Sequence, residues 1–392
     1  MKRREFTKKS SVALAGLSTM GTGIWTGSKK DVIRVGVIGT GDRGGGLISI
    51  MNDIPGLQVV GCCDVLPFRL ESGLNNVAGK AKAYSDYREL LDNKDIDAVI
   101  VSTPFSTHEE IALDVLDAGK HVYCEKTMAK GFEGIQNLVT AASNSNKIFQ
   151  TGHQYHSSRL YTHVVDLIRD GKIGRVVDIV CQWNRNADWR RPVPNPKYER
   201  AINWRMYKEF SGGLLAELCS HQLDLANWIL DAVPLRVIGE GGIDYWKDGR
   251  ETYDNVHMIY TYPNGVRAKF TCLTSNSKDD YLIKILGDKG TITIGYANAW
   301  FYPEKREENK ELGEVDGVSG ATLKWDENKG IPIEVEHLDP TKQALLDFEY
   351  AITQDTMPIS NVESGAKAAI CVQMGLDALY NGGVVPWKTG IV

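Results

Sequence analysis

The sequence lacks three features that would define common classes of protein. With 45 basic and 50 acidic residues its net charge is -5, so it has no basic excess for nucleic acid, and we expect no nucleic-acid partner. Its seven cysteines form no C-x-x-C pair, which argues against a zinc site or a disulfide framework. We therefore expect buried thiols and no bound metal. No apolar run is long enough for a comfortable membrane span.

The first thirty residues differ in kind from the rest. A basic head with the pair Arg3-Arg4 and then Phe6 precedes a short stretch of small and apolar residues at 10–25. This pattern predicts a twin-arginine-like export signal over residues 1–30, and therefore a periplasmic protein. The alternative is a disordered basic tail on a cytoplasmic protein.

A glycine-rich turn follows the first candidate strand. Residues 31–38 are apolar and β-branched, and they lead directly into Gly39-Thr40-Gly41-Asp42-Arg43-Gly44. This is the G-x-G-x-x-G pattern of a dinucleotide-binding turn, in which the glycines allow the tight turn, the approach of a pyrophosphate and close helix packing. The helical pattern that follows begins at Leu47.

An acidic residue ends the second candidate strand. Residues 57–63 are apolar, and Asp64 follows them, twenty residues beyond Gly44. A carboxylate at this distance accepts hydrogen bonds from the adenosine ribose and repels a 2′-phosphate, so it favours NAD over NADP. Because Arg69 lies nearby and an arginine can bind a 2′-phosphate, NADP remains the less favoured alternative cofactor. The alternative role for Asp64 is to form a simple turn at the strand end.

Candidate strands and helices alternate as far as residue 151. The strands are residues 96–101, 121–124 and 148–151, and the helices are residues 84–91, 107–118 and 131–143. This order predicts a parallel sheet with ligand sites at the carboxyl ends of its strands. The candidate contacts for the nicotinamide half of the cofactor are therefore Ser102, Thr103, Pro104, His108, Glu125 and Lys126.

The pattern changes after residue 151. Helical patterns at residues 158–170 and 214–230 flank a strand at 176–183 and a long irregular segment. Strands follow at residues 253–262, 266–274, 281–286 and 291–294, with turn residues at 263–265 and 288–290. We expect a large, open and mainly antiparallel sheet, whose exposed face favours a homo-oligomer.

Two helical patterns follow near the end of the sequence, at residues 343–353 and 362–379, and they can pack back on the first domain. Gly382-Gly383 lies just beyond the second pattern and is typical of a helix end. The predicted fold class is therefore α/β, with two domains. A Rossmann dinucleotide-binding domain covers residues 31–151, and a substrate-binding α+β domain covers residues 152–392.

Three polar residues share one face of the predicted helix at 214–230. Glu217, His221 and Asp224 are spaced four and three apart on an otherwise apolar segment. A histidine titrates near neutrality, so His221 suits proton exchange with a substrate hydroxyl while a carboxylate orients it. The alternative is a salt-bridged helix surface.

The irregular segment at residues 184–208 interleaves aromatic residues with arginines. Aromatic faces stack on sugar C–H surfaces and arginines bind hydroxyls or carboxylates, so the segment favours a carbohydrate, including an acidic or phosphorylated one. A subunit interface or packing loop is the alternative. The candidate substrate contacts are His153, Arg185, Trp189, Trp204, Arg205 and His221.

These motifs together resemble the glucose-fructose oxidoreductase, inositol dehydrogenase and MocA (Gfo/Idh/MocA) family over essentially residues 31–390. The glycine-rich turn matches the family's first Rossmann turn, and Glu125-Lys126-Thr127 resembles its Glu-Lys-Pro signature. Gly212-Gly213 followed by Glu217 and His221 resembles its Gly-Gly, acid and histidine motif. Thr127 replaces the usual proline, and Glu217 replaces the more usual aspartate.

The resemblance implies specific roles. Lys126 would lie beside the nicotinamide and substrate, and His221 would be the acid/base catalyst, with Glu217 near it. Lys126 shares the role of base if burial lowers its pKa. Exported members resembling glucose-fructose oxidoreductase use a twin-arginine signal, which implies a tightly held cofactor loaded before export.

The predicted function is hydride transfer between a tightly held NAD and a secondary hydroxyl of a small-molecule carbohydrate, namely a sugar, glycoside or cyclitol. Two other functions remain open. One is an NAD-dependent glycoside hydrolase that works by transient oxidation and elimination. The other is a non-catalytic regulator that binds NAD or a sugar, since this fold also serves a transcriptional repressor.

Overall fold

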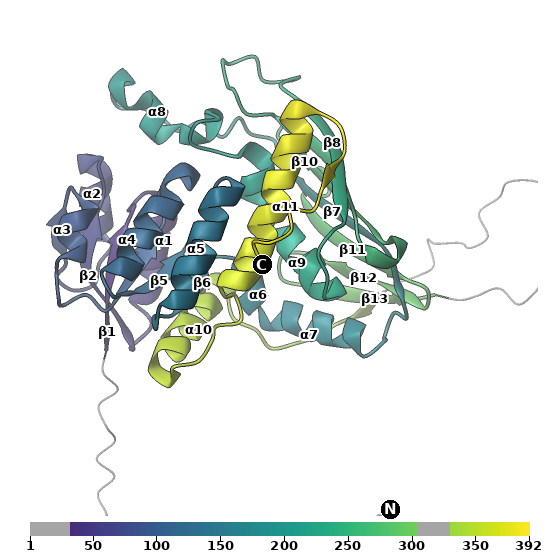
Figure 1. The fold of residues 1–392 in the computed structure, drawn as a ribbon, viewed down its shortest axis with the longest axis horizontal. Helices are drawn as coiled ribbons and strands as arrows, with labels where there is room; N and C mark the ends of the chain where they lie inside the picture. The colour runs from purple at the N-terminus through teal and green to yellow at the C-terminus, as the bar shows by residue number, and fades with distance from the viewer. Residues whose placement is uncertain (1–31, 305–329) are drawn as a thin grey trace, which may run out of the picture. The chain divides into compact units, whose positions relative to one another are not determined.

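A computed structural model of the chain describes residues 32–304 and 330–392 (Figure 1). The export signal predicted at residues 1–30 lies outside these described residues. The described part contains a six-stranded sheet and a nine-stranded sheet, in that order along the chain. Within residues 32–304 and 330–392, no helix is both long and apolar enough to cross a membrane.

The N-terminal sheet is parallel throughout, with the strand order β3-β2-β1-β4-β5-β6. Its strands are β1 (Ile33–Ile38), β2 (Leu57–Cys63), β3 (Lys82–Tyr84), β4 (Ala98–Val101), β5 (His121–Cys124) and β6 (Phe149–Thr151). Its helices are α1 (Asp42–Met51), α2 (Pro67–Asn75), α3 (Tyr87–Leu91), α4 (His108–Asp117) and α5 (Phe132–Asn144). The strand order reverses between β1 and β4, and ligand crevices form at such a point in open α/β sheets.

Two boundaries in this domain differ from the sequence prediction. Helix α1 begins at Asp42 and not at Leu47, although glycines weaken its first turn. Gly44 is needed there, because a Cβ on it would lie 1.9 Å from the carbonyl oxygen of Gly39. Tyr84 ends strand β3, and the helix predicted from that residue starts only at Tyr87, after Asp86 caps it through the backbone N–H of Arg88.

The C-terminal sheet is mixed and mostly antiparallel, so the predicted fold class is confirmed. Its strand order is β14-β13-β12-β11-β7-β10-β9-β8-β15, and among the paired strands only β7 and β10 run parallel in the described residues. Its strands are β7 (Val176–Asn184), β8 (Arg236–Gly242), β9 (Asn255–Thr261), β10 (Arg267–Leu273), β11 (Tyr281–Gly287), β12 (Gly290–Ile294), β13 (Ala299–Pro303), β14 (Ile331–Pro332) and β15 (Val385–Pro386). The hairpins β9–β10 and β11–β12 confirm the two predicted turns, whereas β8 and β13 were not predicted.

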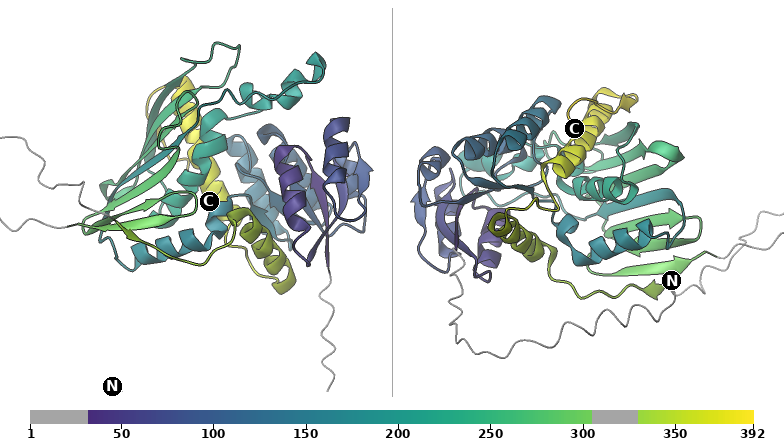
Figure 2. Two further views of the ribbon diagram at one scale, coloured as in Figure 1. Left: turned by 180° about the vertical axis from the view of Figure 1, so that it is seen from behind. Right: turned by 60° about the horizontal axis from the view of Figure 1, so that its bottom comes forward.

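The helices of the second domain lie between the two sheets and around them (Figure 2). They are α6 (Gln154–Ser157), α7 (Arg159–Arg169), α8 (Glu199–Ile202), α9 (Ser220–Leu230), α10 (Pro340–Gln354) and α11 (Val362–Asn381). A π-helical segment, Leu215–Cys219, precedes α9. Short 3-10 turns occur at Phe105–Thr107, Pro196–Tyr198, Trp204–Met206 and Pro263–Gly265.

The two last helices join the domains through apolar packing. Leu345 and Phe348 of α10 share a core with β1 and α1 of the first domain. Helix α11 contacts α5 on one side and α9 and β8 on the other (Figure 1). It ends at Asn381, before Gly382 with a φ of 75°, where a glycine was predicted to stop it. All seven cysteines are buried, as predicted.

Candidate active site

A cavity of about 1140 Å³ lies where the two domains meet. The carboxyl ends of five parallel strands, β1 to β5, contribute to its wall, as expected for a ligand crevice in an open α/β sheet. The opposite wall comes from residues 183–221 and from Tyr296 of the β12–β13 turn. The cavity therefore brings the predicted cofactor turn and the predicted catalytic helix to one continuous space.

The glycine-rich turn has the geometry that its sequence predicts. Gly39 has a φ of 87°, and a Cβ on it would lie 2.7 Å from the carbonyl oxygen of Ser102, so this position requires glycine. Gly41 borders the cavity, where a Cβ would lie 3.2 Å from Nη1 of Arg69. The backbone at Gly41 is thus open to a closely approaching ligand beside a guanidinium.

Asp64 occupies the position predicted for the ribose contact. It lines the cavity just beyond β2, and its two oxygens accept hydrogen bonds from the backbone N–H groups of Thr40 and Leu66, each at 2.9 Å. These two bonds orient the carboxylate and leave lone pairs free for ribose hydroxyls. Together with the open backbone at Gly41, this arrangement fits an adenine dinucleotide.

Two residues of the turn make contacts that the sequence did not suggest. Arg43 is half-buried, and it donates to Glu125 at 2.7 Å and to Gln154 at 3.2 Å, so it connects the turn to β5 and α6. Asp42 accepts a hydrogen bond from Arg191 at 2.9 Å. This pair links the glycine-rich turn to the segment that carries the predicted substrate contacts.

The residues after β4 form the floor of the cavity. Ser102 donates a hydrogen bond to the carbonyl oxygen of Gly39 at 2.7 Å. Both ring nitrogens of His108 lie near carbonyl oxygens, that of Thr127 at 2.8 Å and that of Thr103 at 2.9 Å. Burial lowers the pKa of His108, although these two backbone contacts oppose the shift. His108 thereby connects the ends of β4 and β5.

A buried charged cluster joins the two domains at the centre of the cavity. Nζ of Lys126 donates to the backbone carbonyl oxygen of Glu217 at 2.9 Å and lies 3.8 Å from the Glu217 carboxylate. Nε of Arg205 donates to the same carboxylate at 2.9 Å. Burial alone would raise the pKa of Glu217, but Lys126 and Arg205 outweigh it and keep that pKa below its ordinary value.

Lys126 follows the end of β5 and lines the cavity. Burial lowers its pKa, and the nearby Glu217 and Glu125 carboxylates offset part of that shift. Its peptide bond to Thr127 is cis. The Thr127 hydroxyl donates to the carbonyl oxygen of Ala216 at 3.2 Å, a contact that the family's usual proline would not make.

His221 lies in the first turn of α9, with 5% of its surface exposed, and it lines the cavity. Its ring packs edge-on against His153 and Tyr155, with centroid distances of 5.7 and 5.1 Å. Burial holds the pKa of His221 well below its ordinary value, and the charge of Lys126 acts in the same direction. The imidazole is therefore neutral at pH 7 and able to accept a proton.

The prediction that a carboxylate orients His221 is wrong. Asp224 instead accepts a hydrogen bond from His156 at 2.9 Å, while Glu217 pairs with Arg205 and Lys126. Nδ1 of His221 is buried and has no hydrogen-bond partner among the described residues. One reason is the π-helical segment before α9, because it changes the helical spacing between Glu217 and His221. The other is that His156 and Arg205, which lie in other segments, bind the two carboxylates.

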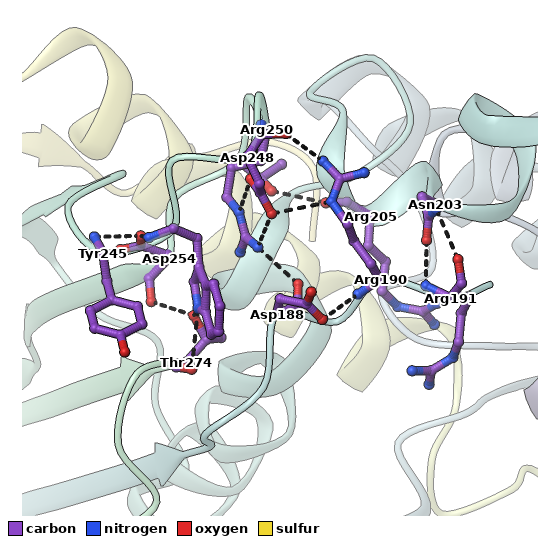
Figure 3. Close-up of polar contacts among 12 residues, drawn as sticks. Asp188, Arg190, Arg191, Asn203, Arg205, Tyr245, Asp248, Arg250, Asp254 and Thr274 are labelled. Carbon is purple, nitrogen blue, oxygen red and sulfur yellow. Dashed lines mark hydrogen bonds and ion pairs between the residues drawn. The ribbon is translucent and has the colours of Figure 1, made fainter. Parts of the chain in front are cut away.

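Residues 184–208 are held in place by a network of arginines and acids (Figure 3). Asp248 accepts hydrogen bonds from Arg190 at 3.2 Å and from Arg250 at 2.7 Å. Arg250, whose side chain is buried, also donates to the carbonyl oxygen of Asp188 at 2.9 Å. The segment is thus anchored to the loop between β8 and β9.

Most of the predicted site residues line this cavity. They are Gly39, Gly41, Asp42, Arg43, Asp64, Arg69, Ser102, Thr103, Pro104, His108, Glu125, Lys126, Arg185, Trp189, Trp204, Arg205, Glu217 and His221. Thr40, Gly44 and His153 are not part of the wall. Thr40 instead supports Asp64, and His153 lies behind His221.

Sequence reasoning missed several residues of the wall. Tyr155 of α6 and Trp183 of β7 pack against His221, and Tyr296 of the β12–β13 turn packs against Trp183 at a centroid distance of 6.0 Å. Tyr155 and Trp183 fall in or beside apolar elements, where an aromatic residue predicts core packing. Only their distance from His221 in three dimensions identifies them.

The fold and the cavity define a class of protein, a two-domain oxidoreductase with a Rossmann domain for NAD. A family model described as an oxidoreductase family with an NAD-binding Rossmann fold matches residues 33–153. The model of the GFO/IDH/MocA C-terminal domain matches residues 161–293. The chain therefore belongs to the Gfo/Idh/MocA family of NAD-binding oxidoreductases.

Relatives of this chain act on sugars and cyclitols. Inositol 2-dehydrogenase from Salmonella paratyphi B is 28% identical over 201 residues, which cover 51% of this chain and 55% of the relative. A 2,7-anhydro-N-acetylneuraminate hydratase from Escherichia coli K12 is 26% identical over 358 residues, which cover 86% of this chain and 88% of that relative.

A solved structure shares the fold. Levoglucosan dehydrogenase in complex with NADH and levoglucosan superposes with a TM-score of 0.72 at 20% identity, and the match covers 91% of this chain and 100% of the other. At this identity the likeness extends to the fold alone. The Rossmann and substrate domains of this chain thus have the same architecture as those of that dehydrogenase.

Proposed function

We propose that this protein transfers a hydride between a secondary hydroxyl of a sugar, glycoside or cyclitol and a tightly held NAD. The observation that carries the proposal is the shared cavity, in which a neutral His221 and the cation Lys126 lie beyond the NAD-binding strand ends. NAD, when bound, would supply the hydride acceptor. Relatives named as an inositol 2-dehydrogenase and, at 25% identity over 241 residues, as a levoglucosan dehydrogenase support this substrate class.

The residues of the cavity divide the work in the proposed reaction. His221 accepts the proton of the substrate hydroxyl, because its buried imidazole is uncharged at neutral pH. Protonated Lys126 stabilises the negative charge that develops on the same oxygen, and because burial lowers the pKa of Lys126, its neutral amine also shares the role of base. The backbone carbonyl oxygen of Glu217 accepts a hydrogen bond from Lys126 and so fixes the position of the lysine. The Glu217 carboxylate accepts a hydrogen bond from Arg205. Tyr155 and Trp183 form the apolar wall around His221 and limit the access of water.

The direct test is to purify the protein, identify any dinucleotide that copurifies, and follow the absorbance of reduced nicotinamide while sugars are added. The panel contains myo-inositol, levoglucosan, common aldoses, their methyl glycosides and the corresponding hexuronates. The proposal expects reduction of bound NAD by at least one member. NAD binding without any reduction across the panel would instead favour a regulator.

A second candidate function is a reaction with no net oxidation, begun by the same proton and hydride removal. The observation that favours it is the relative that covers most of this chain, because it is named a hydratase. Transient oxidation of a ring hydroxyl acidifies the neighbouring C–H group, and loss of that proton expels the leaving group. Water then adds to the resulting unsaturated ketone, and return of the hydride to the carbonyl carbon would restore the hydroxyl. Hydrolysis of a chromogenic glycoside without accumulation of NADH would select this function over the dehydrogenase.

We also propose that the chain is exported after it has bound its cofactor. The support is the pair Arg3-Arg4 in the basic head together with the cavity at the glycine-rich turn, which a dinucleotide would occupy. The test is the double substitution Arg3→Lys with Arg4→Lys, followed by fractionation of the cells. The proposal expects the wild-type protein in the periplasm and the variant in the cytoplasm, and equal distributions would contradict it.

A further inference from the structure

The irregular segment beyond β7 carries five arginines that differ in their partners. Four of them pair with carboxylates, and the shortest nitrogen–oxygen distances are 2.6 Å for Arg190–Glu199, 2.9 Å for Arg191–Asp42, 2.6 Å for Arg200–Glu209 and 2.9 Å for Arg205–Glu217. Arg185 forms no ion pair with any residue in 32–304 or 330–392. It is therefore the arginine whose charge the described protein does not compensate.

Arg185 is held at the wall of the cavity. Its backbone N–H donates to the carbonyl oxygen of Leu273 at 2.7 Å, which continues the pairing of β7 with β10 beyond the strand end. Its guanidinium lies 5.6 Å from the ring centroid of Trp183 and 6.0 Å from that of Trp189. Its Nε is buried and has no hydrogen-bond partner among the described residues. The aromatic faces stabilise the cation only in part, and a desolvated donor without an acceptor is unfavourable.

The same arginine lies close to the proposed reaction centre. Trp183 touches both groups, since its ring centroid is 5.9 Å from that of His221 and 5.6 Å from the Arg185 guanidinium. Nearby, Lys126 and Arg205 share the single carboxylate of Glu217. Around the substrate end of the cavity, basic side chains thus outnumber acidic ones, and a ligand with a negative charge would correct the imbalance.

We infer that the substrate is a sugar that carries a carboxylate, such as a uronate or an aldonate, and that Arg185 binds this group. This inference rests on the proposed function of the cavity and specifies its substrate class. The planar guanidinium matches a carboxylate through two parallel N–H···O bonds. A phosphate also matches a guanidinium, but the single positive charge of Arg185 would balance only one of its two negative charges.

The test measures binding and not turnover, so it stays separate from the proposed function. NAD-loaded protein is titrated calorimetrically with D-glucuronate and D-glucose, with D-galacturonate and D-galactose, and with D-glucose 6-phosphate. We expect at least one uronate to bind tenfold or more tightly than its parent hexose. Arg185→Gln should remove the preference for the uronate and keep the affinity for the hexose. Arg185→Lys should retain part of the preference for the uronate.

A matched control and several outcomes decide the inference. Arg267→Gln removes an arginine that is exposed on β10 and does not line the cavity, so it should bind like the wild type. The inference is overturned if no uronate is preferred, if neither member of either pair binds, or if Arg185→Gln keeps the preference. Preferred binding of the hexose phosphate would assign Arg185 to a phosphate instead. A uronate that binds through Arg185 without reducing NAD would support the inference and contradict the proposed function.

Discussion

Lys126 donates a hydrogen bond from Nζ to the backbone carbonyl oxygen of Glu217 at 2.9 Å, which ties the end of a Rossmann strand to the helical turn before His221. The contact crosses from one domain to the other. It fixes the lysine relative to the histidine without the aid of a ligand. The geometry of the proposed proton transfer is therefore built into the protein before substrate binds.

Replacement of Lys126 by Met should lower kcat more than it raises the KM for the sugar. The variant loses the cation that stabilises the developing alkoxide, and one such donor accounts for about 10²- to 10³-fold in rate. Lys126→Arg keeps the charge and should recover part of the activity. Steady-state kinetics on both variants measure the effect, and a Met variant with a normal kcat would exclude Lys126 from the reaction.

Replacement of His221 by Ala should reduce the rate of NAD reduction by about 10²- to 10⁴-fold, the usual contribution of a general base. NAD should remain bound, because His221 is not among the contacts of the glycine-rich turn. His163→Ala, at an exposed position on α7, is the matched control and should keep full activity. Near-normal turnover in the His221 variant would refute its role.

The pH profile should reflect the depressed pKa of His221. Burial favours the neutral imidazole, so the basic form persists below the ordinary pKa of a histidine. The value of kcat/KM should thus stay constant as the pH falls from 7.5 through about 6.5, and should decline only at lower pH. A half-loss of activity at or above the ordinary histidine pKa would show that His221 is not the titrating base.

Replacement of Asp64 by Ala should weaken NAD binding and shift the preference toward NADP. The carboxylate that accepts from the ribose and repels a 2′-phosphate is lost, while Arg69 remains on the same wall. Hydrogen bonds to charged groups contribute about 1.5–3 kcal/mol, so NAD affinity should fall by about 10- to 150-fold. Asp53→Ala, exposed after α1, is the control, and an unchanged NAD to NADP ratio would contradict this role of Asp64.

Replacement of Asp248 by Ala should destabilise the protein and raise the KM for the sugar. Arg250 and Arg190 lose their shared acceptor, and an uncompensated buried arginine costs about 3 kcal/mol. Arg250 is the largest cause that holds the pKa of Asp248 below its ordinary value. The stabilisation is thus present at neutral pH and is lost as the pH falls through the depressed pKa.

Denaturant unfolding and kinetics together test the role of Asp248. The exposed Asp170→Asn variant is the control and should leave both the free energy of unfolding and the KM unchanged. A destabilised Asp248→Ala variant with a normal KM would mean that the network does not position residues 184–208 for substrate. Unchanged stability would contradict the network itself.

The first domain was predictable from sequence because its signals are local. Gly39 to Gly44 lie within one turn, and Asp64 follows the next strand at a fixed distance, so neighbouring residues carried the information. The error at the start of α1 has the same origin, because consecutive glycines indicate a loop unless tertiary packing requires them. That packing, of Gly44 against the carbonyl oxygen of Gly39, is visible only in three dimensions.

The arrangement around His221 was less predictable because its contacts are distant in the sequence. The spacing of Glu217, His221 and Asp224 suggested one catalytic row on a helix. Asp224 instead pairs with His156, which is 68 residues away, and no helical periodicity reports such a contact. The sequence thus singled out Glu217 and His221, which line the cavity, but it did not indicate the partner of Asp224.

The most direct test of the account is to follow the carbinol hydrogen of the substrate. A sugar that reduces the bound NAD is prepared with deuterium on the carbon that bears the reacting hydroxyl, and the NADH released from the protein is analysed by mass spectrometry. The account predicts that the nicotinamide carries the deuterium. Unlabelled NADH, or deuterium found only in the solvent, would contradict direct hydride transfer in this cavity.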